Sequence, residues 1–190
     1  MRVVDEFDGG IGWIDEGRIP RTSHALAGWL IDAVEPLPDS VGEVRGVIQL
    51  LDRHNRDCAA LAARFSVPHL RAFEACDTVS QAGFEALRVL DRRWWREVAL
   101  WWPERRVLVC ADALGTLPYF RARGERIGVH PLLRLTPPRR LASLAPERIL
   151  VGHGAGVHEN AAAALAGALA TARPRAPAAW AAAVRVARRR

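Results

Sequence analysis

The segment Val47-Ile48-Gln49-Leu50-Leu51-Asp52-Arg53-His54-Asn55-Arg56-Asp57-Cys58 decides how the rest of the sequence is interpreted. It starts as a short apolar run, which predicts a buried strand over 47–51, and it ends in a polar cluster. An alanine-rich run from Ala59 to Phe65 follows directly and predicts a helix. A strand that passes through a polar turn into a helix is a frequent position for an active site in layered α/β proteins.

Two later apolar runs have the same form. Arg106–Ala111 is followed by Asp112, and Ile149–Val151 is followed by Gly152-His153-Gly154. Three predicted strands therefore end beside residues that commonly act as metal ligands or as acids and bases. The two glycines around His153 indicate a close approach of the backbone and a directed side chain.

The remaining pattern predicts an α/β (α+β) fold, because antiparallel strand pairs come early and helices are interspersed later. We expect one domain over 1–172, followed by a Pro/Ala/Arg-rich C-terminal tail or short helix over 173–190. The other expected elements are two short strands over 23–32 broken at Gly28, a hairpin of Glu97–Trp102 with Val107–Ala111, a strand over Arg148–Val151, and helices over Glu159–Ala172 and Ala178–Arg188.

The composition is that of a globular protein, with 190 residues, half of them hydrophobic and a quarter charged. The formal net charge is +6, and all 27 basic residues are arginine. A basic surface attracts polyanions, but charge alone gives only non-specific binding. The sequence contains neither a long uncharged apolar run nor a secretory signal, so we expect no membrane partner and a cytoplasmic location. The three cysteines, Cys58, Cys76 and Cys110, are odd in number and do not have zinc-ribbon spacing, so we expect free thiols.

From about Ser23 to about Leu169 the chain resembles the metallo-β-lactamase fold superfamily. The resemblance is strongest in 105–114 and 146–154, which are similar to the late motifs of the superfamily in residue type, order and separation. It implies a four-layer αββα sandwich with metal ions at one edge of the sheets.

The defining His-x-His-x-Asp-His motif of the superfamily corresponds to Arg53-His54-Asn55-Arg56-Asp57-Cys58. Only the aspartate of that motif is retained. Matched position by position, the first two histidines are Arg53 and Asn55, the aspartate is Asp57, the last histidine is Cys58, the middle histidine of the family is Arg93, its bridging aspartate is Asp112, and its final histidine is His153.

The resemblance therefore implies a degraded dinuclear centre, in which one metal site is erased. The other site keeps Asp57, Cys58, Asp112 and His153, which are all plausible zinc ligands. Two carboxylates and a thiolate would weaken the ion as a Lewis acid, and a closed set of four ligands is typical of structural zinc. We expect one zinc or other divalent ion, or none.

A second consequence concerns the residues that replace the lost ligands. Arg53, Asn55 and Arg93 would stand where the first ion is missing, and either guanidinium could neutralise Asp112 or Asp57 without any metal. Simpler interpretations stay open for each residue: Asp57 as a helix N-cap, Cys58 as a small core residue, and Asp112 as a turn residue. His54, His130 and His158 are candidate replacement ligands, although histidines in loops usually lie at the surface.

Three functions follow from these patterns. The first is a divergent metallo-β-lactamase-fold protein with weak or absent hydrolase activity that still binds a small ligand or a partner. The second is a mononuclear hydrolase of a small ester or thioester, with Asp57 and Asp112 in catalytic roles. The third is a basic nucleic-acid-binding module that uses the tryptophans at 94–95 and 101–102 among arginines. We favour core packing and a homodimer interface for these tryptophans, because alternate strand residues face core and solvent.

Overall fold

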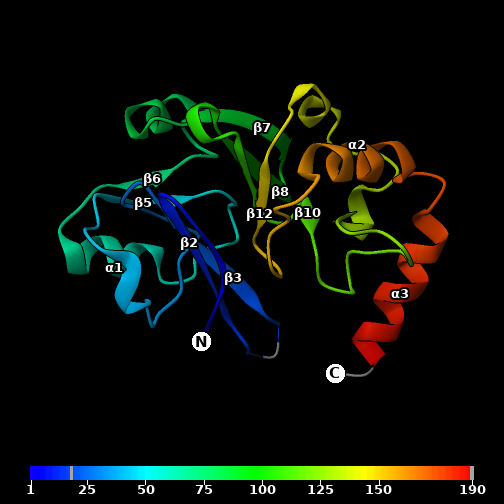
Figure 1. Ribbon diagram of the computed structural model, residues 1–190, viewed down its shortest axis with the longest axis horizontal. Helices are drawn as coiled ribbons and strands as arrows, with labels where there is room; N and C mark the ends of the chain where they lie inside the picture. Colours follow the sequence, from blue (N-terminus) through cyan, green and yellow to red (C-terminus); the bar gives the residue numbers. More distant parts are fainter. Residues whose placement is uncertain (18, 189–190) are drawn as a thin grey trace.

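Two β-sheets pack face to face at the centre of the computed structural model, which describes residues 1–17 and 19–188 (Figure 1). The strands are β1 (Arg2–Phe7), β2 (Gly10–Asp15), β3 (Arg21–Leu26), β4 (Trp29–Ile31), β5 (Gly46–Gln49), β6 (His69–Arg71), β7 (Glu85–Arg92), β8 (Trp95–Trp102), β9 (Val107–Cys110), β10 (Leu114–Gly115), β11 (Gly128–Val129) and β12 (Arg148–Val151). The first sheet has the order β1-β2-β3-β4-β5-β6 and the second β12-β9-β8-β7, with β10-β11 as a separate pair. Pairing is antiparallel except where β5 lies parallel to β4 and β6, and β12 lies parallel to β9.

Helices cover the outer faces of both sheets and complete a four-layer αββα sandwich. The α-helices are α1 (Cys58–Phe65), α2 (Ala161–Thr171) and α3 (Ala176–Arg188), and the 3₁₀ turns are η1 (Asp39–Val41), η2 (Cys76–Ala82), η3 (Pro103–Arg105), η4 (Pro131–Leu133) and η5 (Arg139–Ser143). In Figure 1, α1 lies outside the six-stranded sheet and α2 lies outside the four-stranded sheet. The structure thus has the fold class that the sequence predicts.

Side-chain alternation explains why Val47 and Ile48, which are consecutive in β5, are both apolar. Leu30 and Val47 pack with Leu61 of α1, whereas Ile31 and Ile48 pack into the core between the two sheets. Successive residues of a strand point to opposite faces, so a strand that is covered on both sides has apolar residues on both faces.

The segment after β5 leaves the first sheet and joins the second. The carbonyl of Leu50 accepts a hydrogen bond from the N–H of Val98 at 3.0 Å, and the N–H of Asp52 donates to the carbonyl of Arg96 at 3.1 Å. The predicted strand over 47–51 therefore ends earlier, at Gln49. This crossing carries residues 53–57 to the edge at which β9 and β12 end.

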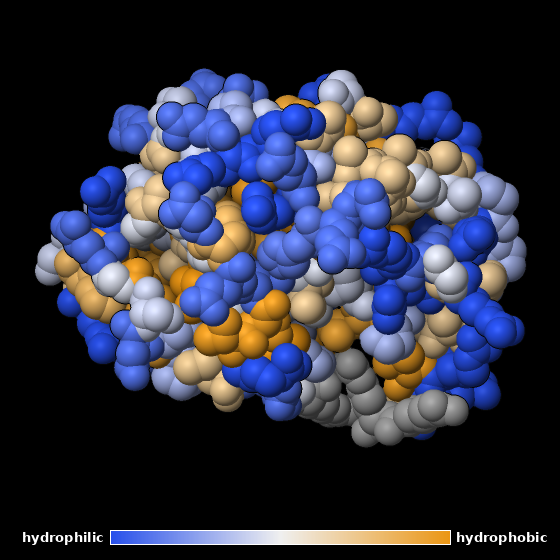
Figure 2. Space-filling model, viewed as in Figure 1, coloured by the Kyte–Doolittle hydropathy of each residue, from blue (hydrophilic) through white to orange (hydrophobic). Residues whose placement is uncertain are grey.

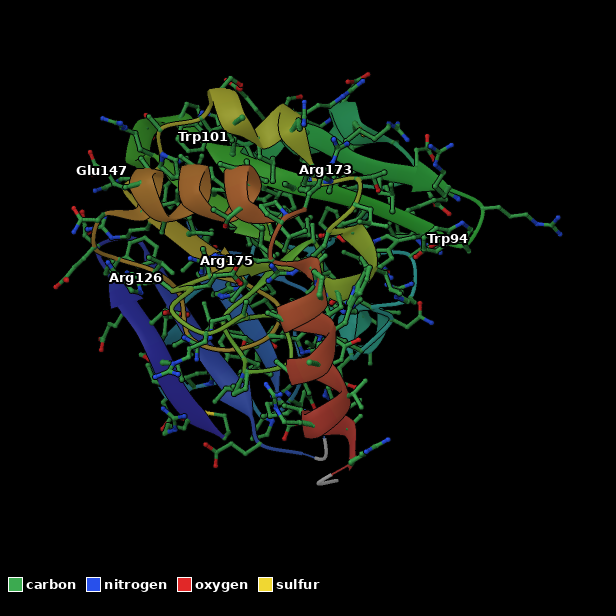
Figure 3. The ribbon with its side chains drawn as sticks, turned by 90° about the vertical axis from the view of Figure 1, so that its right-hand side faces the viewer. Trp94, Trp101, Arg126, Glu147, Arg173 and Arg175 are labelled. Carbon is green, nitrogen blue, oxygen red and sulfur yellow. The ribbon has the colours of Figure 1, made fainter. Side chains whose placement is uncertain are left out.

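The tryptophan-rich hairpin of β7 and β8 is partly core and partly surface. Trp95 is fully buried, whereas its neighbour Trp94 is exposed at the tip of the hairpin (Figure 3). The guanidinium of Arg53 lies 4.1 Å above the ring of Trp95, and that of Arg105 lies 5.9 Å from the ring of Trp102. The predicted division between core and solvent is confirmed, and the dimer interface stays a prediction.

The C-terminal segment is helical up to Arg188, and positions 189–190 of the predicted tail lie outside the described residues. Helix α3 packs on η4, where the indole N–H of Trp180 donates to the carbonyl of Pro131 at 2.8 Å. Within the described ranges, none of the helices combines the length and the apolar character that a membrane crossing requires. On the face drawn in Figure 2, hydrophilic side chains surround smaller apolar patches.

Candidate metal centre

Three potential ligand atoms meet at the edge where the two sheets come together. Oδ1 of Asp112 lies 3.0 Å from Nε2 of His54 and 3.1 Å from Nε2 of His153, and all three atoms lie within 4.8 Å of one another. Around a tetrahedral ion with bonds of about 2.0–2.2 Å, ligand atoms stand about 3.3–3.6 Å apart. The three atoms could therefore hold one ion after small adjustments.

The sheet topology brings Asp112 and His153 together. Asp112 follows β9 and His153 follows β12, and these strands are parallel neighbours with Val151 opposite Cys110. Parallel strands end at the same edge of a sheet. Between the strand end and His153, a side chain at Gly152 would have its Cβ 2.6 Å from the carbonyl oxygen of Ala111, so the close approach requires glycine.

Each histidine is oriented by a contact with its other ring nitrogen. Nδ1 of His153 lies 2.7 Å from the carbonyl oxygen of Pro20, and Nδ1 of His54 lies 2.9 Å from Oδ2 of Asp32. Both partners are acceptors, so each Nδ1 carries the proton, and Nε2 of each neutral ring is an acceptor. A histidine held this way by a carboxylate or a carbonyl is a common metal ligand.

Asp32 is itself fixed in place at the end of β4. Its Oδ1 accepts the N–H of Leu50 at 2.9 Å while its Oδ2 faces His54. Asp32 therefore connects the crossing segment, the end of β4 and the histidine ring.

Oδ1 of Asp112 is buried and has no hydrogen bond of normal geometry to any described residue, although both Nε2 atoms are near. Three acceptor atoms this close repel one another unless a cation lies among them. The donor set of two imidazoles and one carboxylate suits zinc and other divalent ions. The residues present therefore fit a metal ion.

The local electrostatics also favour positive charge at this point. Burial alone would raise the pKa of Asp112, but the nearby rings of His153 and His54 hold that pKa well below its ordinary value. The pKa of His54 is raised overall. Burial and the charge of Arg56 act to lower it, but the carboxylates of Asp32 and Asp112 act more strongly in the opposite direction. In the metal-free chain, a proton on the His54 ring can thus supply part of the positive charge that a metal ion would bring.

Glu97 supports Asp112 from within the core. Its Oε1 accepts the backbone N–H groups of Asp112 at 3.0 Å and Ala113 at 2.9 Å, and its Oε2 accepts the indole N–H of Trp95 at 2.7 Å. Burial, together with the charge of Asp112, raises the pKa of Glu97 to about 7. Sequence reasoning missed Glu97, although a glutamate before the apolar run Val98-Ala99-Leu100 is a sign of a buried, paired carboxylate.

Arg53 lies on the other carboxylate oxygen of Asp112. Nη2 of Arg53 is 3.4 Å from Oδ2 of Asp112, and Nη1 is 3.4 Å from the carbonyl oxygen of Trp94. This is one of the pairings that the sequence suggested. It places a fixed positive charge beside the three ligand atoms.

The other residues singled out in the sequence lie apart from the cluster of ligand atoms. Asp57 stands at the N-cap of α1, but its carboxylate accepts the N–H of Glu35 at 2.9 Å. Cys58 is fully buried in the apolar cluster under α1, where burial raises the pKa of its thiol to about 12. Asn55 is exposed and accepts a hydrogen bond from Gln49 at 3.4 Å. Arg93 is exposed in the turn between β7 and β8.

The expectation that His54 lies at the surface is wrong, because the residue is only 8% exposed. The backbone at Arg56 turns through a positive φ of 41°, and the guanidinium of Arg56 donates to the carbonyls of Thr22 and Asp32, both at 2.6 Å. Together with the crossing of the chain, this local fold turns His54 toward Asp112. Arg53, which matches the first histidine of the family motif, lies nearer the solvent.

A pocket of about 480 Å³ opens onto the ligand atoms. His130 forms part of its wall, and burial lowers the pKa of His130 to about 4, so this ring is neutral near pH 7. The pocket is lined by Ile19, Asp112, Leu117, Tyr119, Phe120, His130, His153, Val186 and Ala187.

Comparison with known proteins places this geometry in a known fold. No protein-family model and no curated protein matches the sequence. Among solved structures, a fragment of the putative diflavin flavoprotein A 5 from Nostoc sp. PCC 7120 is similar with a TM-score of 0.61 and 13% identity, covering 93% of this chain and 97% of that one. A metallo-β-lactamase from Pontibacter korlensis has a TM-score of 0.56 and 9% identity, covering 89% and 98%. The metallo-β-lactamase FIM-1 from Pseudomonas aeruginosa, solved in its mono-zinc form, has a TM-score of 0.51 and 13% identity, covering 91% and 97%. At these identities the likeness shows the fold, which is the metallo-β-lactamase fold.

Proposed function

We propose that this metallo-β-lactamase-fold chain is a hydrolase that uses a single divalent metal ion, held by Nε2 of His54, Oδ1 of Asp112 and Nε2 of His153. The observation that carries the proposal is the convergence of these three acceptor atoms, with both rings already oriented through Nδ1. The donor set differs from the one that the motif register implied, because His54 takes part and Asp57 and Cys58 do not.

The arrangement supports a catalytic role more than a structural one. Structural zinc is closed by four protein ligands, whereas catalytic zinc keeps an open position. Here the chain provides three ligands, and two of them, Asp112 and His153, line a pocket. When bound, a divalent ion would supply Lewis acidity toward water and toward a substrate oxygen.

The residues around the ligands have separate tasks in this proposal. Asp32 and the carbonyl of Pro20 hold the protons on the two Nδ1 atoms, so that Nε2 remains a donor of electrons to the ion. Glu97 fixes the backbone of Asp112. The apolar part of the wall, with Phe120 and Val186, would exclude water from the acyl side of a small ester or thioester.

Hydrolysis of small aryl esters and thioesters by the full chain, reconstituted with one equivalent of Zn²⁺ after chelation, tests the proposal. We expect metal-dependent turnover that falls at least a hundredfold in His153→Ala and in Asp112→Ala. Asp57→Asn is the matched control and should keep its activity, because the Asp57 carboxylate accepts the N–H of Glu35 and does not belong to the proposed ligand set. Zinc binding without turnover would favour the alternative, a ligand-binding protein with a degraded hydrolase centre. Equal activity in Asp57→Asn and His153→Ala would contradict the proposed ligand set.

A further inference from the structure

The guanidinium of Arg53 lies at the edge of the candidate metal centre, beside Asp112. Its guanidinium lies over the face of Trp95 at 4.1 Å, and the indole of Trp95 is itself fixed by Glu97 at 2.7 Å. Nη1 also reaches the carbonyl of Trp94. The side chain is nevertheless 43% exposed. A guanidinium that is held on a rigid platform and still faces solvent is ready to bind a ligand, because little rotamer freedom is lost on binding.

The hydrogen bonds of Arg53 leave capacity for such a ligand. Among the described residues, Arg53 donates two hydrogen bonds, both of 3.4 Å, which is beyond the usual range of about 2.7–3.2 Å. By contrast, the buried Arg134 donates to Glu125 and Phe120 at 2.6 and 2.7 Å, and Arg56 donates at 2.6 Å. Arg134 and Arg56 serve the fold, whereas Arg53 is held by stacking on Trp95 and keeps its hydrogen-bonding capacity.

The charge around the centre points to the sign of the ligand. The guanidiniums of Arg53 and Arg56 balance the carboxylates of Asp32 and Asp112. Even with Glu97 ionised, a divalent ion would therefore leave the centre with net positive charge. At the pocket wall, burial raises the pKa of Tyr119 and lowers that of His130, and the charges of Asp112 and Arg53 act on both groups in opposite directions.

We propose that Arg53 binds an oxyanion, a carboxylate or a phosphate, on the substrate, so that the hydrolase acts on small esters or thioesters that carry such a group beside an apolar part. This inference rests on the proposed function. The planar fork of the guanidinium matches an oxyanion in two-point contact. The apolar wall of Leu117, Phe120 and Val186 accommodates the remainder of the molecule.

Calorimetric titration of the full chain with benzoate, phenyl phosphate and the neutral benzamide tests this inference, with and without bound zinc. We expect at least tenfold tighter binding of one of the two anions than of benzamide, and the preferred anion identifies the oxyanion. Arg53→Gln should reduce that preference at least tenfold in the metal-free chain. Arg88→Gln is the matched control and should keep it, because Arg88 is a half-buried arginine on β7 that pairs with Asp91 at 2.8 Å.

The outcomes separate the two proposals. A preference that survives in Arg53→Gln, or is absent from the native chain, overturns the role of Arg53 and leaves the zinc hydrolase intact. A preference that depends on Arg53 in a chain that binds no zinc supports the anion site and rejects the hydrolase. Should Arg53→Gln fail to fold, Arg53→Lys decides, because it keeps the charge and loses the fork: an unchanged preference for anions then contradicts two-point binding.

Discussion

Nε2 of His54 lies 3.0 Å from Oδ1 of Asp112, and the opposite nitrogen of the same ring faces Asp32 at 2.9 Å. A neutral imidazole has one proton, and here it has two carboxylates to satisfy. The ring must therefore become an imidazolium or share its Nε2 with a metal ion. The chemistry proposed for the chain depends on this relationship.

The stability of the chain should respond to pH in opposite ways with and without metal. The folded pKa of His54 is raised, so its contribution is present below the unfolded value of about 6.5 and is lost as pH rises through the folded pKa. Glu97, with a pKa raised to about 7, acts in the same direction because its neutral form is favoured in the fold. Zinc binding instead requires neutral histidines and strengthens with pH.

We therefore expect the rise in melting temperature caused by Zn²⁺ to grow between pH 5.5 and pH 8, as the metal-free chain loses stability. Thermal unfolding in paired samples measures it. A zinc effect that is independent of pH would contradict a site that contains His54.

The cysteines should differ in reactivity. Burial raises the pKa of Cys58 to about 12 and that of Cys110 well above its ordinary value, whereas Cys76 is only half-buried. Because thiolates are the reactive form, one thiol should be modified in the folded chain and three after denaturation. Mass spectrometry after alkylation counts them. Rapid modification of Cys58 that zinc prevents would instead support Cys58 as a ligand.

Glu97→Gln should weaken both the fold and the metal site. The amide can accept the N–H groups of Asp112 and Ala113 through its oxygen, but its NH₂ then faces the indole N–H of Trp95, which leaves a buried donor unpaired. We expect a loss of about 1–3 kcal/mol in the free energy of unfolding. Chemical denaturation measures the loss, and zinc affinity should fall in parallel. The exposed Glu85→Gln on β7 is the control and should change neither.

The pocket wall depends on a buried ion pair. Arg134 and Glu125 meet at 2.6 Å, with side chains only 0% and 4% exposed, and Arg134 also holds the carbonyl of Phe120 at 2.7 Å. Arg134→Gln leaves a buried carboxylate without its charge partner, so we expect a destabilisation of about 3–5 kcal/mol. Arg139→Gln, at an exposed position of η5, should be nearly neutral. Equal unfolding midpoints for the two variants would show that the pair is not important.

Part of the fold can be predicted from the sequence, because strands such as β9 and β12 are apolar runs and the α-helices are rich in alanine. The hairpin of β8 and β9 and the helix α1 are confirmed by the structure. The sequence also places Asp112 and His153 directly after apolar runs. Because these runs form the parallel neighbours β9 and β12, both residues lie at the same edge of the sheet.

The rest of the site depends on backbone geometry that no local pattern encodes. The motif register favours Asp57 and Cys58, but the chain leaves the first sheet after Gln49 and turns His54 inward. Asp32 could have been found, since it follows the apolar run Trp29-Leu30-Ile31 just as Asp112 follows its strand. Its contact with His54 needed the three-dimensional structure.

Calorimetric titration of the chelated chain with Zn²⁺ counts the metal ions that His54, Asp112 and His153 hold. We expect one site per chain, lost in His54→Ala and in His153→Ala and retained in Asp57→Asn. Two sites per chain, or full binding in His54→Ala, would contradict this expectation.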